Sequence, residues 1–158
     1  MQYNYNHIFL ENRQISNTSA IRWSCFTAMV IGIAWIFTLF HIISVPAPAF
    51  QIIAPVSIFI LLLPAVVNHL MHLSDILLVG SKGINLLTGL ILGCNLTAVF
   101  LLSSTLSHYA SIIWLLSTLI ACQYYSKRIT SHIFLGGIVG MILSFYVSIY
   151  LGIEDLSL

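Results

Sequence analysis

The chain has 158 residues, of which five are basic and four acidic, and its hydrophobic fraction is 59%. Soluble globular domains carry roughly a quarter of charged residues, so this composition excludes an ordinary soluble domain. The net charge of +1 and the lack of a basic cluster beyond one Lys-Arg pair argue against a nucleic-acid partner.

The chain begins with a polar segment and continues with five apolar ones. Residues 1–20 are rich in Asn, Gln and Ser, and we expect a short, partly ordered cytoplasmic tail there. The apolar segments are residues 21–44, 50–73, 83–106, 109–125 and 133–151. About 20 apolar residues cross a ~30 Å hydrocarbon core as a helix. The sequence therefore predicts an all-α integral membrane bundle of about five transmembrane helices (residues 21–152), followed by a short tail (residues 153–158).

Proline and glycine positions refine this expectation. Pro46 and Pro48 end the first segment, and Pro64 lies inside the second, where we expect a kink. Small residues recur at four-residue spacing, as in Gly89-to-Gly93 and Gly136-to-Gly140. This spacing allows two helix backbones to approach closely within a membrane, so it predicts close helix packing.

The basic residues predict the orientation of the chain. With five crossings, residues 1–20 and the links at 74–82 and 126–131 lie on one side of the membrane, and all five Lys and Arg residues fall on that side. Positive charges are enriched on the cytoplasmic side. We therefore expect a cytoplasmic N-terminus and a C-terminus outside.

Histidines are the first candidates for chemistry in so apolar a chain. His69, His72 and Asp75 are three residues apart, so they share a helix face, and with His132 they offer ligands suited to zinc or iron. His41 and His108 lie at similar depth, an arrangement that suits axial haem ligation. Polar residues at helix ends at the membrane interface explain both patterns more simply. We therefore expect neither a bound metal nor a cofactor.

A block near the C-terminus resembles a known family. The segment Arg128-Ile129-Thr130-Ser131-His132, followed by Gly136-Gly137 and Gly140, is similar to the last conserved block of small membrane proteins of the type 2 phosphatidic acid phosphatase (haloperoxidase-like) superfamily, in its divergent Bacteroidetes versions. Residues 73–78 are similar to a segment that those proteins carry between two earlier spans, and the resemblance covers residues 50–151. It implies a bacterial inner membrane location and, in an active member, hydrolysis of a lipid phosphate or diphosphate.

The resemblance also implies roles for individual residues. His132 would be the nucleophile that attacks phosphorus, and Arg128, with Lys127, would neutralise the phosphate. The acidic residue that the family places four positions after the nucleophile is Gly136 here. The family's first motif is absent after Lys82.

The family's second motif is reduced to Leu106-Ser107-His108. The predicted topology places His108 and His132 at opposite ends of one span, roughly 30 Å apart, too far to act on one phosphoryl group. We interpret the chain as a divergent relative of lipid phosphatases with degenerate catalytic motifs.

Two functions remain open at this point. In the first, the protein contacts phosphorylated membrane lipids through Lys127, Arg128 and Lys82. In the second, it is a non-catalytic membrane subunit or scaffold, whose glycine faces pack against partner helices or a second copy of the chain.

Overall fold

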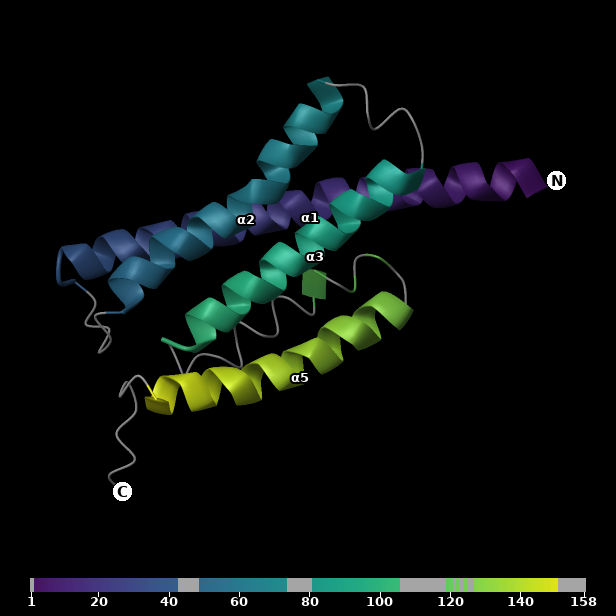
Figure 1. The fold of residues 1–158 in the computed structure, drawn as a ribbon. Coiled ribbons are helices and arrows are strands. Elements are labelled where there is room, and N and C mark those ends of the chain that lie inside the picture. Colours follow the sequence, from purple (N-terminus) through teal and green to yellow (C-terminus); the bar gives the residue numbers. More distant parts are fainter. Residues whose placement is uncertain are drawn as a thin grey trace.

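The described part of the chain is helical. The structure, a computed structural model, describes residues 2–42, 49–73, 81–105, 119–120, 122, 124 and 127–150. Within them lie the long helices α1 (Gln2–Leu39), α2 (Phe50–Leu73), α3 (Ser81–Ser103) and α5 (Lys127–Tyr150) (Figure 1). All four contain a stretch that is long and apolar enough to cross a bilayer. The chain is thus a multi-pass, all-α membrane protein, while the predicted span at 109–125 falls almost wholly outside the described residues.

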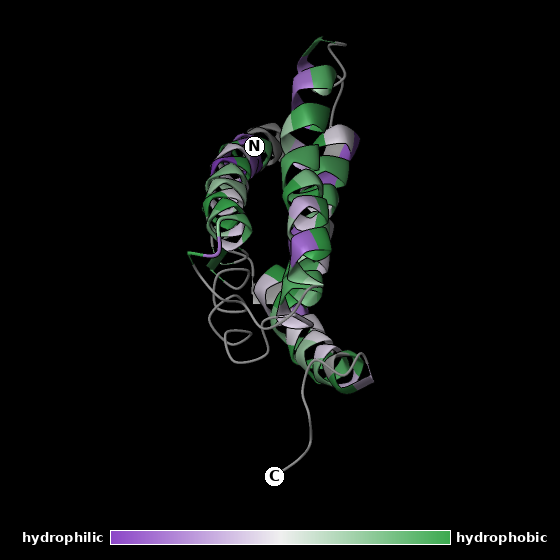
Figure 2. Cartoon of the chain, turned by 90° about the vertical axis from the view of Figure 1, so that its left-hand side faces the viewer, coloured by the Kyte–Doolittle hydropathy of each residue, from purple (hydrophilic) through white to green (hydrophobic). Residues whose placement is uncertain are grey.

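Large apolar side chains cover the outside of these helices. Ile52 is 71% exposed, Phe59 69% and Leu86 66%. In water each would incur a cost of about 25 cal/mol for every Å² of apolar surface, whereas in lipid this cost vanishes. Figure 2 shows the apolar residues spread along the helices, with few hydrophilic bands. The surface therefore fits a hydrocarbon environment.

Three apolar clusters stacked along the bundle establish the directions of the helices. Their buried members include Ala20, Met71 and Leu87 in the first, Ala28, Leu61 and Ala98 in the second, and Phe50, Ala54 and Leu102 in the third, where Trp35 of α1 also packs. From the first cluster to the third, residue numbers rise along α1 and α3 and fall along α2. Helix α2 is therefore antiparallel to α1 and α3, which run parallel to each other.

Hydrogen bonds between polar side chains define the register of α1 against α3. The bonded pairs are Arg13 with Asn85, Asn17 with Thr88, and Ser24 with Asn95. Their separations in sequence are 72, 71 and 71 residues. Because the offset hardly changes over 11 residues of α1, roughly 16 Å of helix, the two helices lie side by side without slipping.

This register corrects the expectation for residues 1–20. They were expected to form a partly ordered tail, but α1 begins at Gln2 and continues unbroken into the apolar segment. Asn17 is only 2% exposed, and Ala20 is fully buried. Arg13 and Asn17 of this segment bond to side chains of α3, so a polar sequence is packed there as a helix that extends beyond the apolar stretch.

Helices α2 and α5 differ in how they pack. Pro64 lies inside α2, and Figure 1 shows the C-terminal part of α2 turning away from α1, as a proline-induced bend requires. Of the described helices, α5 packs mainly on α3 and exposes much of its apolar surface.

A methyl group added to Gly89, Gly93 or Gly136 would meet no atom within 4 Å in the described part. The close backbone approach expected at these glycines is therefore not formed there.

Candidate functional site

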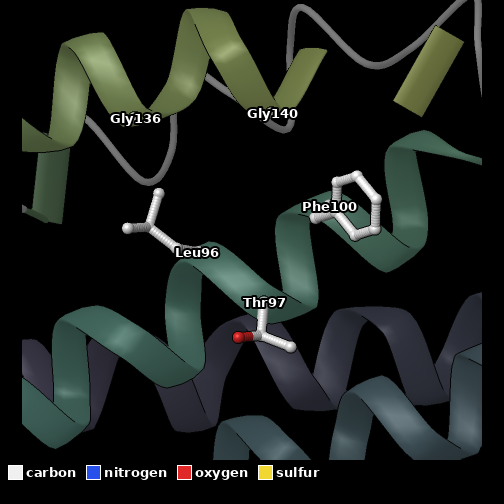
Figure 3. Close-up of a pocket in the computed structure, with 5 residues that line it drawn as sticks. All are labelled: Leu96, Thr97, Phe100, Gly136 and Gly140. Carbon is white, nitrogen blue, oxygen red and sulfur yellow. The ribbon is translucent and has the colours of Figure 1, made fainter. Parts of the chain in front are cut away.

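The predicted lipid-binding residues lie at helix starts that share one end of the bundle. Lys82 is the second residue of α3, and Lys127 and Arg128 are the first two of α5. Across one cavity, Leu96 of α3 lies on the side of Gly136 of α5, and Phe100 lies on the side of Gly140 (Figure 3). Residue numbers therefore rise in the same direction along both helices, so α3 and α5 run parallel. We call the end marked by Lys82, Lys127 and Arg128 the basic end.

Helix polarity makes the basic end attractive to anions. The first turn of each helix presents unpaired backbone N–H groups and the positive end of the helix dipole. Lysine or arginine at that position opposes the dipole, so these cations do not stabilise their own helices. Lys82 is exposed to its surroundings. Cations combined with two helix N-termini suit an external anion such as a phosphate.

Among the described residues, the histidines near this end belong to no cluster that could hold a metal ion. His69 and His72 are exposed at the C-terminal end of α2, which meets the basic end because α2 is antiparallel to α3. No group of three His, Cys, Asp or Glu side chains comes together among the described residues. Asp75, the third member of the predicted set, lies outside them.

His132, the nucleophile implied by the resemblance, lies in the second turn of α5. Its side chain is exposed. The next residue on the same face is Gly136, which has no side chain to orient the imidazole and instead lines the cavity toward α3. The other implied catalytic histidine, His108, lies outside the described residues. The described part of α5 therefore offers a histidine without the acid that the family uses to orient it.

An apolar cavity lies between α3 and α5, further along the same two helices. It measures about 240 Å³, and its lining includes Leu96, Thr97 and Phe100 on α3 and Gly136 and Gly140 on α5. Figure 3 shows Leu96 and Phe100 extending from α3 toward the glycines. Gly136 follows Arg128 by eight residues, roughly 12 Å along the helix. The cavity thus begins within reach of a lipid tail whose head group lies at the basic end.

Sequence reasoning missed a polar seam close to this end, which is buried except at the bond between Arg13 and Asn85. We define the seam as Arg13, Asn17 and Ser24 of α1, Asn85, Thr88 and Asn95 of α3, and Tyr124. The Asn17 Oδ1 atom accepts hydrogen bonds from the hydroxyls of Thr88 (3.0 Å) and Tyr124 (2.9 Å). The Asn17 amide nitrogen donates to the Ile84 carbonyl at 3.3 Å. One asparagine thus joins three segments of the chain.

The second level of the seam is as well satisfied as the first. The Asn95 amide donates to Ser24 Oγ at 2.9 Å and to the Ile91 carbonyl at 2.8 Å, while the Ser24 hydroxyl donates to the Ala20 carbonyl at 3.0 Å. Ser24 is completely buried, and Asn95 is 4% exposed. Because these buried groups are hydrogen-bonded, the bonds offset the cost of desolvating them and the seam holds α1 against α3. Polar residues spaced four and seven apart on α1, and three and seven apart on α3, were the signal for it in the sequence.

His41, one of the two predicted haem candidates, has a structural role at the end of α1. It adopts a left-handed backbone conformation with φ of 54°. The His41 N–H bonds to the Thr38 carbonyl at 3.1 Å, and the Ile42 N–H bonds to the Phe37 carbonyl at 2.9 Å. This pair of bonds is the Schellman motif that closes a helix C-terminus. The side chain of His41 is exposed.

Comparisons with protein-family models, with curated proteins and with solved structures find no match to this chain. The fold and the basic end therefore have to be interpreted from the chain itself.

Proposed function

We propose that this membrane protein binds the phosphate of anionic lipids at its basic end, and that it is a divergent relative of type 2 phosphatidic acid phosphatases which no longer hydrolyses them. The observation that carries the proposal is that Lys82 and the pair Lys127 and Arg128 lie at the N-terminal ends of two parallel helices. The cavity between α3 and α5 offers an apolar site for one acyl chain of the same lipid, which favours a lipid over a free phosphate.

We further propose five crossings, with the N-terminus in the cytoplasm and the C-terminus outside a bacterial inner membrane. Tyr124 supports the crossing predicted at residues 109–125, which would bring the total to five. The chain leaves the far end of α3 at Thr105, yet Tyr124 bonds to Asn17 near the start of α3. Between the end of α3 and Tyr124 the chain therefore has to come back from the level of Ser103 to that of Thr88. This distance is roughly 22 Å at 1.5 Å per residue, which is most of the ~30 Å core.

Lipid binding is tested with the purified protein in detergent and two lipids, phosphatidic acid and phosphatidylcholine, whose bound fractions are measured by native mass spectrometry. Wild type retains phosphatidic acid preferentially. A Lys127→Gln plus Arg128→Gln variant binds it about thirtyfold more weakly, since each cation near an anionic surface contributes roughly 1 kcal/mol. Arg22→Gln, which also removes a cation, serves as control and leaves binding unchanged. Equal retention of both lipids by wild type contradicts the proposal.

Loss of hydrolysis has its own test. Phosphate release from phosphatidic acid or a lipid diphosphate is compared between wild type and His132→Ala. We expect no difference, because the position at which the family carries its acidic residue is Gly136 in this chain. Release that depends on His132 would show an active enzyme and contradict this part of the proposal.

The alternative role, a non-catalytic subunit, also has one observation in its favour. Gly89, Gly93 and Gly136 are glycines in helices, yet no atom of the described part fills the space beside them. Small residues on a lipid-facing helix surface are typical of contacts with further helices. This role predicts a stoichiometric protein partner that co-purifies in mild detergent.

A further inference from the structure

The register between α1 and α3 sets a charged residue level with the middle of the apolar span of α3. Arg22 lies between the bonded pairs Asn17–Thr88 and Ser24–Asn95, so the offset of 71 residues sets it level with Gly93. Gly93 is at the centre of the apolar span Lys82–Ser103. Ile84, near the start of this span, is nine residues from Gly93, roughly 14 Å along the helix. An arginine side chain at the level of Gly93 is too short to bridge that distance. Arg22 therefore lies near mid-depth and out of reach of the head groups.

Arg22 belongs to a continuous polar strip on the face of α1 that points away from α3. Glu11, Gln14, Thr18, Ser19 and Arg22 lie at helical spacing and, with Ile15, line an open cavity of about 560 Å³. We call these five polar residues the polar stripe. Arg22, Thr18 and Gln14 are exposed, and Arg22 makes no hydrogen bond or ion pair within the described residues.

An exposed arginine at this depth needs an anionic partner. A charge facing hydrocarbon costs several kcal/mol, so charges inside membranes pair with opposite charges or border water. A guanidinium donates two parallel hydrogen bonds to a carboxylate, and the resulting ion pair has no net charge. Such a pair is the strongest partner arrangement for an arginine in lipid. Lipid phosphates lie at the head groups, too far from Arg22. A second copy related by a twofold axis along the membrane normal would set Arg22 against Arg22.

We propose that the polar stripe is the docking surface for a transmembrane helix of another protein, and that this helix carries an Asp or Glu at mid-membrane depth opposite Arg22. Gln14 and Thr18 then offer further polar contacts along the same helix. This surface lies on the side of α1 opposite α3, so the proposal is independent of lipid binding at the basic end.

The test uses the full-length protein in lipid vesicles and a synthetic polyleucine helix with one central Glu, with Gln and Leu versions as matched controls. Association is measured by energy transfer between a dye on the protein and a dye on the helix. Wild type binds the Glu helix about tenfold more tightly than the Leu helix. Arg22→Leu abolishes this preference, Arg22→Lys retains it because the charge remains, and Lys82→Leu leaves it unchanged.

Three outcomes overturn the proposal. The first is equal affinity of wild type for the Glu and Leu helices. The second is a preference that survives Arg22→Leu. The third is a change of oligomeric state in Arg22→Leu without any preference for the Glu helix, which would assign the stripe to a second copy. The conservative Arg22→Lys variant separates loss of charge from loss of fold.

Discussion

Replacing Asn17 by Leu should destabilise the bundle by about 2 kcal/mol. The side chain takes part in three hydrogen bonds, with Thr88, Tyr124 and the Ile84 carbonyl. Hydrogen bonds between membrane helices contribute roughly 0.6 kcal/mol each on average, with a maximum near 1.7. Thr88 keeps its second acceptor, the Ile84 carbonyl at 2.8 Å, so the loss falls mainly on Tyr124, whose hydroxyl is left without an acceptor in a buried site.

The free energy of unfolding is measured by titrating dodecyl sulfate into mixed micelles and following helix content. A double-mutant cycle of Asn17→Leu with Tyr124→Phe isolates the bond between the two side chains, and we expect a coupling of about 0.6–1.7 kcal/mol. Thr27→Val is the matched control, since the exposed Thr27 hydroxyl bonds only to the Trp23 carbonyl of its own helix. An Asn17→Leu variant within 0.5 kcal/mol of wild type (about the error between independent sites) would refute the seam as a source of stability.

Three further changes test other parts of the fold. In a cysteine-free background, Asn17→Cys should form a disulfide with Thr88→Cys but not with Asn95→Cys, which lies two turns away, and the reverse pattern on a non-reducing gel would disprove the register. His41→Gly should raise the free energy of unfolding by about 1 kcal/mol, because glycine adopts the left-handed conformation without strain; a decrease would mean that the imidazole itself is needed. Gly136→Ala should cost nothing in the same assay, because the added methyl meets no atom within 4 Å in the described part, and a loss above about 1 kcal/mol would place another segment against it.

Apolar length predicted most of the helices. The predicted segment 50–73 coincides with α2, Phe50–Leu73, and residues 83–106 and 133–151 overlap α3 and α5 closely. This success has a simple cause: a helix in lipid satisfies its own backbone, so about 20 apolar residues suffice to define it. The predicted span 109–125 stays a prediction, supported by the position of Tyr124.

The first 20 residues could not be interpreted in the same way. Average hydropathy counts Arg13 and Asn17 as polar, and a polar segment before a span resembles a tail. What matters in the structure is the direction in which these side chains point. Their spacing puts them on one face of α1, toward Asn85 and Asn95 of α3. The spacing marks a polar face on each helix, but the pairing of the two faces is seen only in the packed structure.

The register also changes what the positive charges mean. Arg22 was counted among the cytoplasmic cations, but its level with Gly93 puts it about as far from one end of α3 as from the other. The other cations still lie at one end of the bundle: Arg13, Lys82 and the pair at the start of α5. The prediction of a cytoplasmic N-terminus therefore does not change. Arg22 thus gives no information on the orientation of the chain, and its side chain bonds to nothing in the described part. Its partner has to lie outside the described residues. A partner carboxylate at the same depth meets that requirement, and a head group does not.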